Sequence, residues 1–479
     1  MKVFKQWPIY FIGRILPAGV GFCAIALYTR LLAPASFGIY ALLLSTSFFV
    51  GLIGFTWLRV ASLRMIASVA PADEPKLMAT IGLGFFGMSI VVSAVTVLIV
   101  RIYQPAWGWT PALLTAACAV ASGWFELNVS IMQARLRIVA YSVLQMIRAL
   151  LALAASLVLI AAGFKANALL GGFAIGNCAG LGALGIWRGA AISGRFDSKL
   201  LRKIFHFGWP VSATAISNMS VTFLRYLLNA FSGSATVGIF AAASDFSQQT
   251  IGLLIGTATI AGQPLAFRAR DLGNHQELAE QLKNNARLIF AIGFPATVGL
   301  IALAGPISEV YLGPRFHVHA GLLIAISAIV MFLSGLRTSY FEQAFEIAMR
   351  TMAVAVNTGV RLVLVVVPSF WLIAHYGAVG AADSVLISEM IGLAVSIVWA
   401  NSLMRLPIPW WSWLKIASAT GVMLAALQLM PGKSTPIGLA AAIVTGVAVY
   451  AGAIALTHIQ GLRMYFGKVP HALQRSPRS

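Results

Sequence analysis

Long apolar segments recur along the whole chain and are separated by short polar turns. A helix of about 20 apolar residues can cross the roughly 30 Å hydrocarbon core of a bilayer. The pattern predicts an all-α integral membrane protein. Its 14 predicted membrane-spanning helices lie at roughly 9–32, 37–57, 77–100, 111–132, 138–162, 167–187, 208–231, 236–261, 285–304, 318–338, 350–374, 378–403, 413–430 and 436–457.

The first two predicted helices form a hairpin whose pattern returns about 200 residues later. In the first copy, a short turn leads into Phe37-Gly38-Ile39-Tyr40-Ala41. In the second copy, a turn of serine and glycine leads into Val237-Gly238-Ile239-Phe240-Ala241. Self-similarity at this period indicates two halves built alike. It predicts two six-helix lobes related by a pseudo-two-fold axis around a central cavity.

The last two predicted helices follow a tryptophan cluster and lie outside the repeat, so we expect them to form an additional pair. The predicted division of the chain is therefore a first lobe at 1–188, a cytoplasmic linker at 189–207, a second lobe at 208–403, and the helix pair with a basic tail at 404–479. In the linker, an apolar face lies opposite a basic face, which consists of Lys199, Arg202 and Lys203. This pattern favours an amphipathic helix in the membrane interface over a solvated connector.

Composition supports a membrane protein and excludes a separate soluble domain. Hydrophobic residues make up 59% of the chain and charged residues only 10%, whereas soluble domains are about 25% charged. The net charge of +20 does not indicate nucleic-acid binding, because most lysines and arginines lie in short loops on one side of the predicted helices. This positive-inside bias predicts that both termini are cytoplasmic, and it is compatible with attraction to anionic lipid headgroups.

Catalytic and cofactor-binding patterns do not emerge from the sequence. The 7 histidines are scattered, and the 3 cysteines fall within apolar segments without metal-ligand spacing. The sequence has no P-loop. We therefore expect neither a cofactor or metal site nor an enzymatic activity.

Four arginines lie five or more residues from either end of a predicted membrane helix, where a charge is costly and needs a partner or a function. Arg148 and Arg361 are each about ten residues, or ~15 Å, into their helices. They also occupy similar positions in two related apolar runs, which predicts that both face the central cavity. A structural salt bridge within one helix bundle is the alternative. Arg14 and Arg225 lie nearer to helix ends, where extending to the membrane surface is the alternative to a cavity role.

Two acidic residues lie deep within predicted helices and are candidates for coupling or charge balance. Asp245 belongs to a polar run in the eighth helix, and its repeat partner Ser45 is neutral. Glu389 lies in the middle of the twelfth helix. Either carboxylate can neutralise an arginine or carry a proton, and the sequence does not choose between these roles.

Several segments together resemble the polysaccharide (O-antigen type) flippases of the multidrug/oligosaccharidyl-lipid/polysaccharide flippase superfamily. The resemblance covers about residues 1–403. The segments are the arginine-containing first helix, LLAPASFGIYALL, Gly208-Trp209-Pro210, VGIFAAAS, and Gln263-Pro264 followed by Arg268.

The resemblance implies a flippase that moves undecaprenyl-diphosphate-linked oligosaccharide from the cytoplasmic to the periplasmic leaflet by alternating access. It implies a cationic cavity, which in this chain falls on Arg14, Arg148, Arg225 and Arg361. The expected partners are the lipid-linked oligosaccharide, membrane lipids, and the polymerase and glycosyltransferases of surface polysaccharide synthesis. We expect the protein to be a monomer.

Three alternatives remain open at this point. A lipid II flippase would share the plan of 14 helices. A cation-coupled multidrug exporter of the same fold would need carboxylates in its first lobe to bind cationic substrates. The first helix here has Arg14 and no acidic residue. A membrane-embedded glycosyltransferase or polymerase would need an acidic motif and a large outside loop, and the longest predicted outside loop has only about 15 residues.

Overall fold

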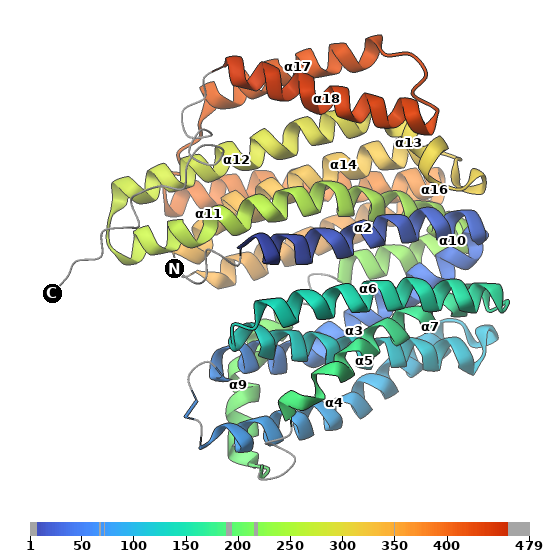
Figure 1. The fold of residues 1–479 in the computed structure, drawn as a ribbon, viewed down its shortest axis with the longest axis vertical. Helices are drawn as coiled ribbons and strands as arrows, with labels where there is room; N and C mark the ends of the chain where they lie inside the picture. The colour runs from blue at the N-terminus through green and yellow to red at the C-terminus, as the bar shows by residue number, and fades with distance from the viewer. Residues whose placement is uncertain are drawn as a thin grey trace. The chain divides into compact units, whose positions relative to one another are not determined.

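The computed structural model describes residues 7–66, 69–70, 72–187, 194–214, 219–348 and 350–457. All regular secondary structure in these ranges is helical (Figure 1). Ten helices in the described part are long and apolar enough to cross a membrane. The predicted class of an all-α integral membrane protein is therefore confirmed, while the count of 14 helices stays a prediction.

The chain forms two compact units, Met1–Ala241 and Ala242–Ser479. The helices of the first unit are α2 (Trp7–Leu31), α3 (Pro34–Ile66), α4 (Glu74–Tyr103), η1 (Pro105–Trp107), α5 (Trp109–Ala134), α6 (Ile138–Ala161), α7 (Lys165–Asn177), η2 (Cys178–Trp187), α9 (Ser198–Thr214) and the first part of α10 (Met219–Ser247). The predicted lobe boundary at 207/208 stays a prediction. The units themselves divide within α10.

The second unit contains the end of α10 and the helices that follow it. These are η4 (Gln248–Gly252), α11 (Leu253–Asp271), α12 (His275–Ala302), α13 (Ala304–Tyr311), η5 (Pro314–Phe316), α14 (Ala320–Leu336), η6 (Arg337–Phe341), α15 (Gln343–Ile347), α16 (Thr351–Leu403), α17 (Trp410–Leu429) and α18 (Pro436–Leu456). The last pair packs on α12, where Trp413 stacks on Phe290 with ring centroids 4.7 Å apart and the Tyr450 hydroxyl donates to the Ala291 carbonyl at 2.7 Å.

Glycines with positive φ interrupt α10 and α16 where the sequence predicts turns. Gly233 in α10 has φ of 79°, and Gly377 in α16 has φ of 55°. These values are costly for residues with a Cβ and easy for glycine. They fall between the seventh and eighth and between the eleventh and twelfth predicted helices. Parts of the seventh and eighth therefore share α10, and the eleventh and twelfth share α16.

The two glycines of the repeated motif contact each other where α3 crosses α10. A Cβ added to Gly38 would lie 1.8 Å from the Ser234 carbonyl oxygen, and one added to Gly238 would lie 2.1 Å from the Pro34 carbonyl oxygen. The contact is reciprocal, because Pro34 and Ser234 are also separated by the repeat period. Only glycine lets two helix backbones approach this closely, which explains why both copies of the motif carry it. A pseudo-two-fold relation of whole lobes stays a prediction.

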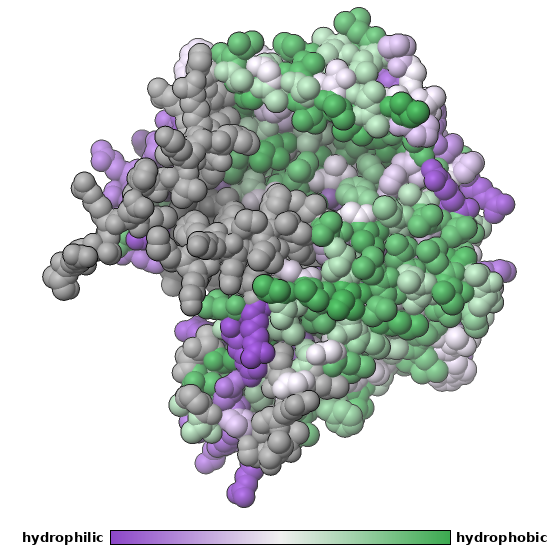
Figure 2. Space-filling view, in the orientation of Figure 1, coloured by the Kyte–Doolittle hydropathy of each residue, from purple (hydrophilic) through white to green (hydrophobic). Residues whose placement is uncertain are grey.

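Large apolar side chains remain exposed along much of the described surface, including Phe86, Ile102 and Val398. Figure 2 shows hydrophobic residues over much of the visible face. Exposed apolar area of this extent is expected where a protein contacts hydrocarbon. The chain is therefore a multi-pass membrane protein.

Candidate functional site

A carboxylate in the first unit joins two arginines from neighbouring helices. Glu126 on α5 lies 3.2 Å from an Arg148 guanidinium nitrogen on α6 and 3.7 Å from an Arg59 nitrogen on α3. The Arg148 guanidinium also lies over the Phe125 ring, 4.5 Å from its centroid. We call Arg59, Glu126 and Arg148 the arginine–glutamate triad. Three helices position it, so its geometry depends on the packing of α3, α5 and α6.

The triad carries a net charge of +1 and remains accessible. The side chains of Arg59 and Arg148 are 40% and 31% exposed. Each guanidinium has five N–H donors, and Glu126 uses only a part of them. A pair of accessible arginines can bind an oxyanion through two parallel hydrogen bonds each. The triad is therefore able to bind a phosphate or diphosphate group.

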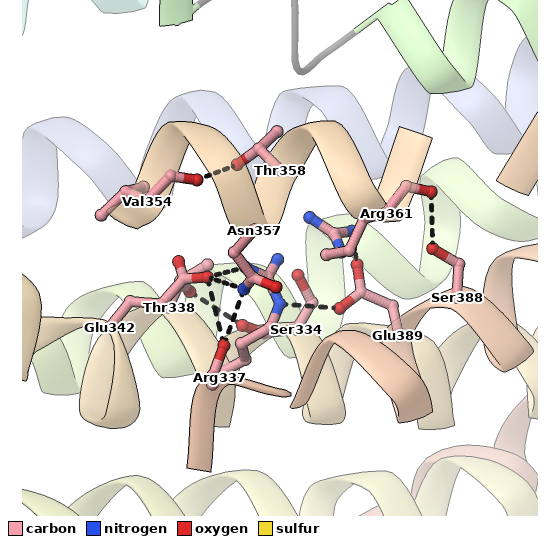
Figure 3. A network of polar contacts seen from close by, with 11 residues as sticks. Ser334, Arg337, Thr338, Glu342, Val354, Asn357, Thr358, Arg361, Ser388 and Glu389 are labelled. Atoms are coloured by element: carbon pink, nitrogen blue, oxygen red, sulfur yellow. Dashed lines mark hydrogen bonds and ion pairs between the residues drawn. The ribbon is translucent and has the colours of Figure 1, made fainter. Parts of the chain in front are cut away.

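A second charged group lies buried in the second unit (Figure 3). Arg337 donates to Glu342 at 2.5 Å and to Glu389 at 3.0 Å, and Glu389 also forms an ion pair with Arg361. Asn357 donates to Glu342 at 2.8 Å. We call Arg337, Glu342, Arg361 and Glu389 the buried charge network.

The buried charge network has two positive and two negative side chains and is therefore neutral. Arg337 and Glu389 are each only 3% exposed, while Arg361 is 18% exposed. Charges buried this deeply are stable only when each has a partner, because uncompensated desolvation costs several kcal/mol. Arg361 thus forms a salt bridge within the second unit, which is one of the two alternatives that the sequence left open. Its predicted role toward a substrate stays a prediction.

Sequence reasoning missed Arg337 and Glu342. Arg337 lies one residue from the end of the helix predicted at 318–338 and was therefore not counted among the arginines inside helices. In the structure, the apolar pattern continues through the π-helical η6 into α15, so both residues are enclosed by α14, α15 and α16. The sequence does contain an indication that Arg337 is buried, because apolar residues lie on both sides of it in the run FLSGLRTSYFEQAF. Single-turn π-helical segments are frequent at functional sites.

The remaining predicted residues occupy different surroundings. Arg225 on α10 is buried and donates to the Ala41 carbonyl on α3 at 3.0 Å, so it does not extend to the surface. Asp245 is half-buried on α10, after the break at Gly233. Arg14 lies on α2, and its side chain is outside the described part of the structure. The structure thus brings Arg361 together with Glu389, and pairs Arg148 with Glu126.

Comparisons with known proteins found one matching family and several similar solved structures. A model of the family described as polysaccharide biosynthesis protein matches residues 27–321. No curated protein sequence matches significantly. The lipid II flippase MurJ, solved in an inward closed conformation, is 13% identical and superposes with a TM-score of 0.78, over 94% of this chain and 98% of that chain.

Two further solved structures are multidrug transporters. An inward-facing MATE family transporter of the MOP superfamily is 17% identical, with a TM-score of 0.62 over 82% of this chain and 97% of that chain. The MATE multidrug transporter DinF-BH is 13% identical, with a TM-score of 0.56 over 82% of this chain and 93% of that chain. At these identities the likeness concerns the fold alone.

Proposed function

This chain belongs to the polysaccharide biosynthesis protein family, and we propose that it is a flippase for undecaprenyl-diphosphate-linked oligosaccharide. It carries this substrate from the cytoplasmic to the periplasmic leaflet by alternating access, as a step in the synthesis of a surface polysaccharide. The observation that carries the proposal is the arginine–glutamate triad, an accessible cationic group on membrane-spanning helices.

The chemistry of the triad suits a lipid diphosphate. The diphosphate is a compact anion with several acceptor oxygens, and guanidinium groups bind such oxygens bidentately. In the absence of substrate, Glu126 forms ion pairs with both arginines. A diphosphate carries more negative charge than Glu126 and can replace it as their partner. The Phe125 ring beneath Arg148 keeps the guanidinium plane in place by a cation–π contact.

The other charged residues have supporting roles in this proposal. Arg14, Arg225 and Arg361 are further cationic positions along the path of the diphosphate. Arg361 becomes available only when Glu389 releases it, so Glu389 links the charge of the second unit to the transport cycle. We propose that glycosyltransferases act before the flippase and the polymerase acts after it. We further propose that the flippase works as a monomer.

A lipid II flippase is the second candidate. It is favoured by the superposition on MurJ over 94% of this chain. A cation-coupled drug exporter fits less well, because the triad has a net positive charge and would repel cationic drugs. The test of the proposal is flipping by the purified protein in proteoliposomes that contain either undecaprenyl-diphosphate-linked oligosaccharide or lipid II. Faster movement of lipid II would replace the proposed substrate with the second candidate, and movement of neither would reject both.

Reporter fusions test the proposed topology in the inner membrane, with both termini cytoplasmic. Fusions after Ser198 and Asn274 should give a cytoplasmic signal, because lysines and arginines concentrate on that side. Fusions at Ser234 and Lys433 should give a periplasmic signal. Reporters with complementary activity, such as alkaline phosphatase and a cytoplasmic fluorescent protein, provide the measurement. A periplasmic signal at Asn274 would contradict both the helix count and the pairing of lobes.

Asp245→Asn tests whether this carboxylate serves coupling or charge balance. The substitution mimics the protonated form, so we expect turnover to fall while binding of the lipid-linked oligosaccharide stays within about twofold of wild type, because the residue does not bind sugar. Binding by the purified variant is compared with glycan export in cells. Loss of binding together with export would place Asp245 in the substrate site, and unchanged export would leave it a structural residue.

A further inference from the structure

An open groove lies between α9 and α4 in the first unit and is separate from the arginine–glutamate triad. Its volume is about 420 Å³, within the range of small-molecule sites. Its lining residues are Trp57, Gly84, Gly87, Met88, Val91, Ser198, Leu201, Arg202 and Phe205. Apolar side chains and glycines form the walls, and Arg202 is the one charged residue that lines it within the described part of the chain.

Helix α9 is held firmly above this groove. Asp197 accepts hydrogen bonds from the first backbone N–H groups of α9, including that of Lys199 at 2.8 Å, and forms an ion pair with Lys76 of α4 at 2.7 Å. The hydrogen bond from Lys76 lowers the pKa of Asp197, because it stabilises the charged carboxylate. At the other end of α9, the Gly208 backbone passes so close to Trp57 that an added Cβ would lie 2.3 Å from the Trp57 carbonyl oxygen. The groove is thus a fixed feature of the unit.

The exposed side of α9 beside Arg202 is basic, and the neighbouring surface of α4 is apolar. Lys199, Arg202 and Lys203 are all exposed on α9, so their charges are available to a ligand. Phe86 and Val91 of α4 are exposed beside the groove, as expected for a helix that faces hydrocarbon. A ligand that fits both parts has an apolar chain and an anionic head. In Figure 1, α9 runs across α3 and α4 instead of along them.

We propose that this groove binds an anionic glycerophospholipid of the surrounding bilayer. One acyl chain lies along Gly84, Gly87 and Leu201, and the phosphate is bound by Arg202 with Lys199 and Lys203. Basic groups near a membrane surface attract anionic headgroups, and an arginine adds directional hydrogen bonds to phosphate. The bound lipid fills the space between α9 and α4. It is a structural partner, distinct from any transported substrate. This inference does not rest on the proposed function.

The experiment uses the purified full-length protein in detergent, with an equimolar mixture of phosphatidylglycerol and phosphatidylcholine, and counts bound lipid by native mass spectrometry. Wild type should retain one phosphatidylglycerol in preference to phosphatidylcholine. Gly87→Leu fills the groove, since a Cβ there meets no atom within 4 Å, and should reduce retention about tenfold. Gly421→Leu is the matched control, because Gly421 on α17 is equally open, and it should behave as wild type.

Arg202→Gln leaves the apolar walls unchanged and tests the headgroup contact independently. It should bring the ratio of the two bound lipids close to one, while Lys433→Gln should leave the preference intact. Full retention of phosphatidylglycerol by Gly87→Leu, or an unchanged preference in Arg202→Gln, would overturn the proposal. Displacement of phosphatidylglycerol by an equal concentration of undecaprenyl phosphate would also overturn it, because the groove would then belong to a transported lipid.

Discussion

Arg148→Ala is expected to reduce glycan export by about 10- to 100-fold while the protein still inserts into the membrane. A hydrogen bond to a charged group is worth about 1.5–3 kcal/mol, and each 1.4 kcal/mol is a factor of ten. Arg148 is the member of the arginine–glutamate triad that lies deepest along its helix and stacks on Phe125. Its loss leaves Arg59 and Glu126 as a neutral pair with little affinity for an anion.

The measurement is surface polysaccharide in cells that lack the native gene, normalised to the abundance of the variant in the membrane. Arg148→Lys should restore export only in part, because lysine keeps the charge but loses the planar fork. Arg101→Ala removes an arginine that contacts Trp109 at the C-terminal end of α4, and export should stay near wild type. Normal export by Arg148→Ala at native abundance would reject the triad as the diphosphate site.

Glu389→Ala should destabilise the protein by about 3–5 kcal/mol, the cost of leaving buried charges without a partner. Glu389 is the carboxylate that joins Arg337 to Arg361. Without it, Glu342 is the remaining carboxylate in the network for two guanidinium groups. The measurement is thermal unfolding of the purified variant in detergent, together with its abundance in the membrane.

A double variant separates charge imbalance from loss of packing. Glu389→Met with Arg361→Met removes one ion pair and leaves Arg337 with Glu342, so the network is neutral again. Replacing a buried pair by apolar residues of similar volume is often neutral or stabilising, and most of the lost stability should return. A double variant that is stable but does not export would support the proposed role of Arg361. Wild-type stability of Glu389→Ala would show that the network is not needed for folding.

The sequence predicted the fold class because the information is local. Apolar segments of membrane-spanning length are visible in any window of 20 residues. Gly233 and Gly377 lie between such segments, where glycine favours a turn. The arginines within helices are visible for the same reason, since a charge interrupts an apolar run. The repeated glycines Gly38 and Gly238 were found as a motif, although their mutual contact becomes apparent only in three dimensions.

Ion-pair partners could not be predicted, because they depend on which helices pack together. Nothing in the sequence shows that α3 and α6 bring an arginine to either side of Glu126. Glu389 was singled out as a carboxylate in the middle of a predicted helix, and it is 3% exposed. Its contact with Arg337 required an additional π-helical turn, and this turn has no reliable sequence pattern.

The crossing of α3 and α10 has a kinetic consequence. Its two backbones meet through Gly38 and Gly238, and the helices are joined further along by polar contacts such as that between the Thr46 and Tyr226 hydroxyls at 2.7 Å. Arg225, which is 7% exposed, donates to the Ala41 carbonyl across the same crossing at 3.0 Å. A buried donor that loses its partner costs about 1–3 kcal/mol, and a charged one costs more. Parting this crossing therefore has a high activation barrier, and we expect α3 and α10 to move together during a transport cycle.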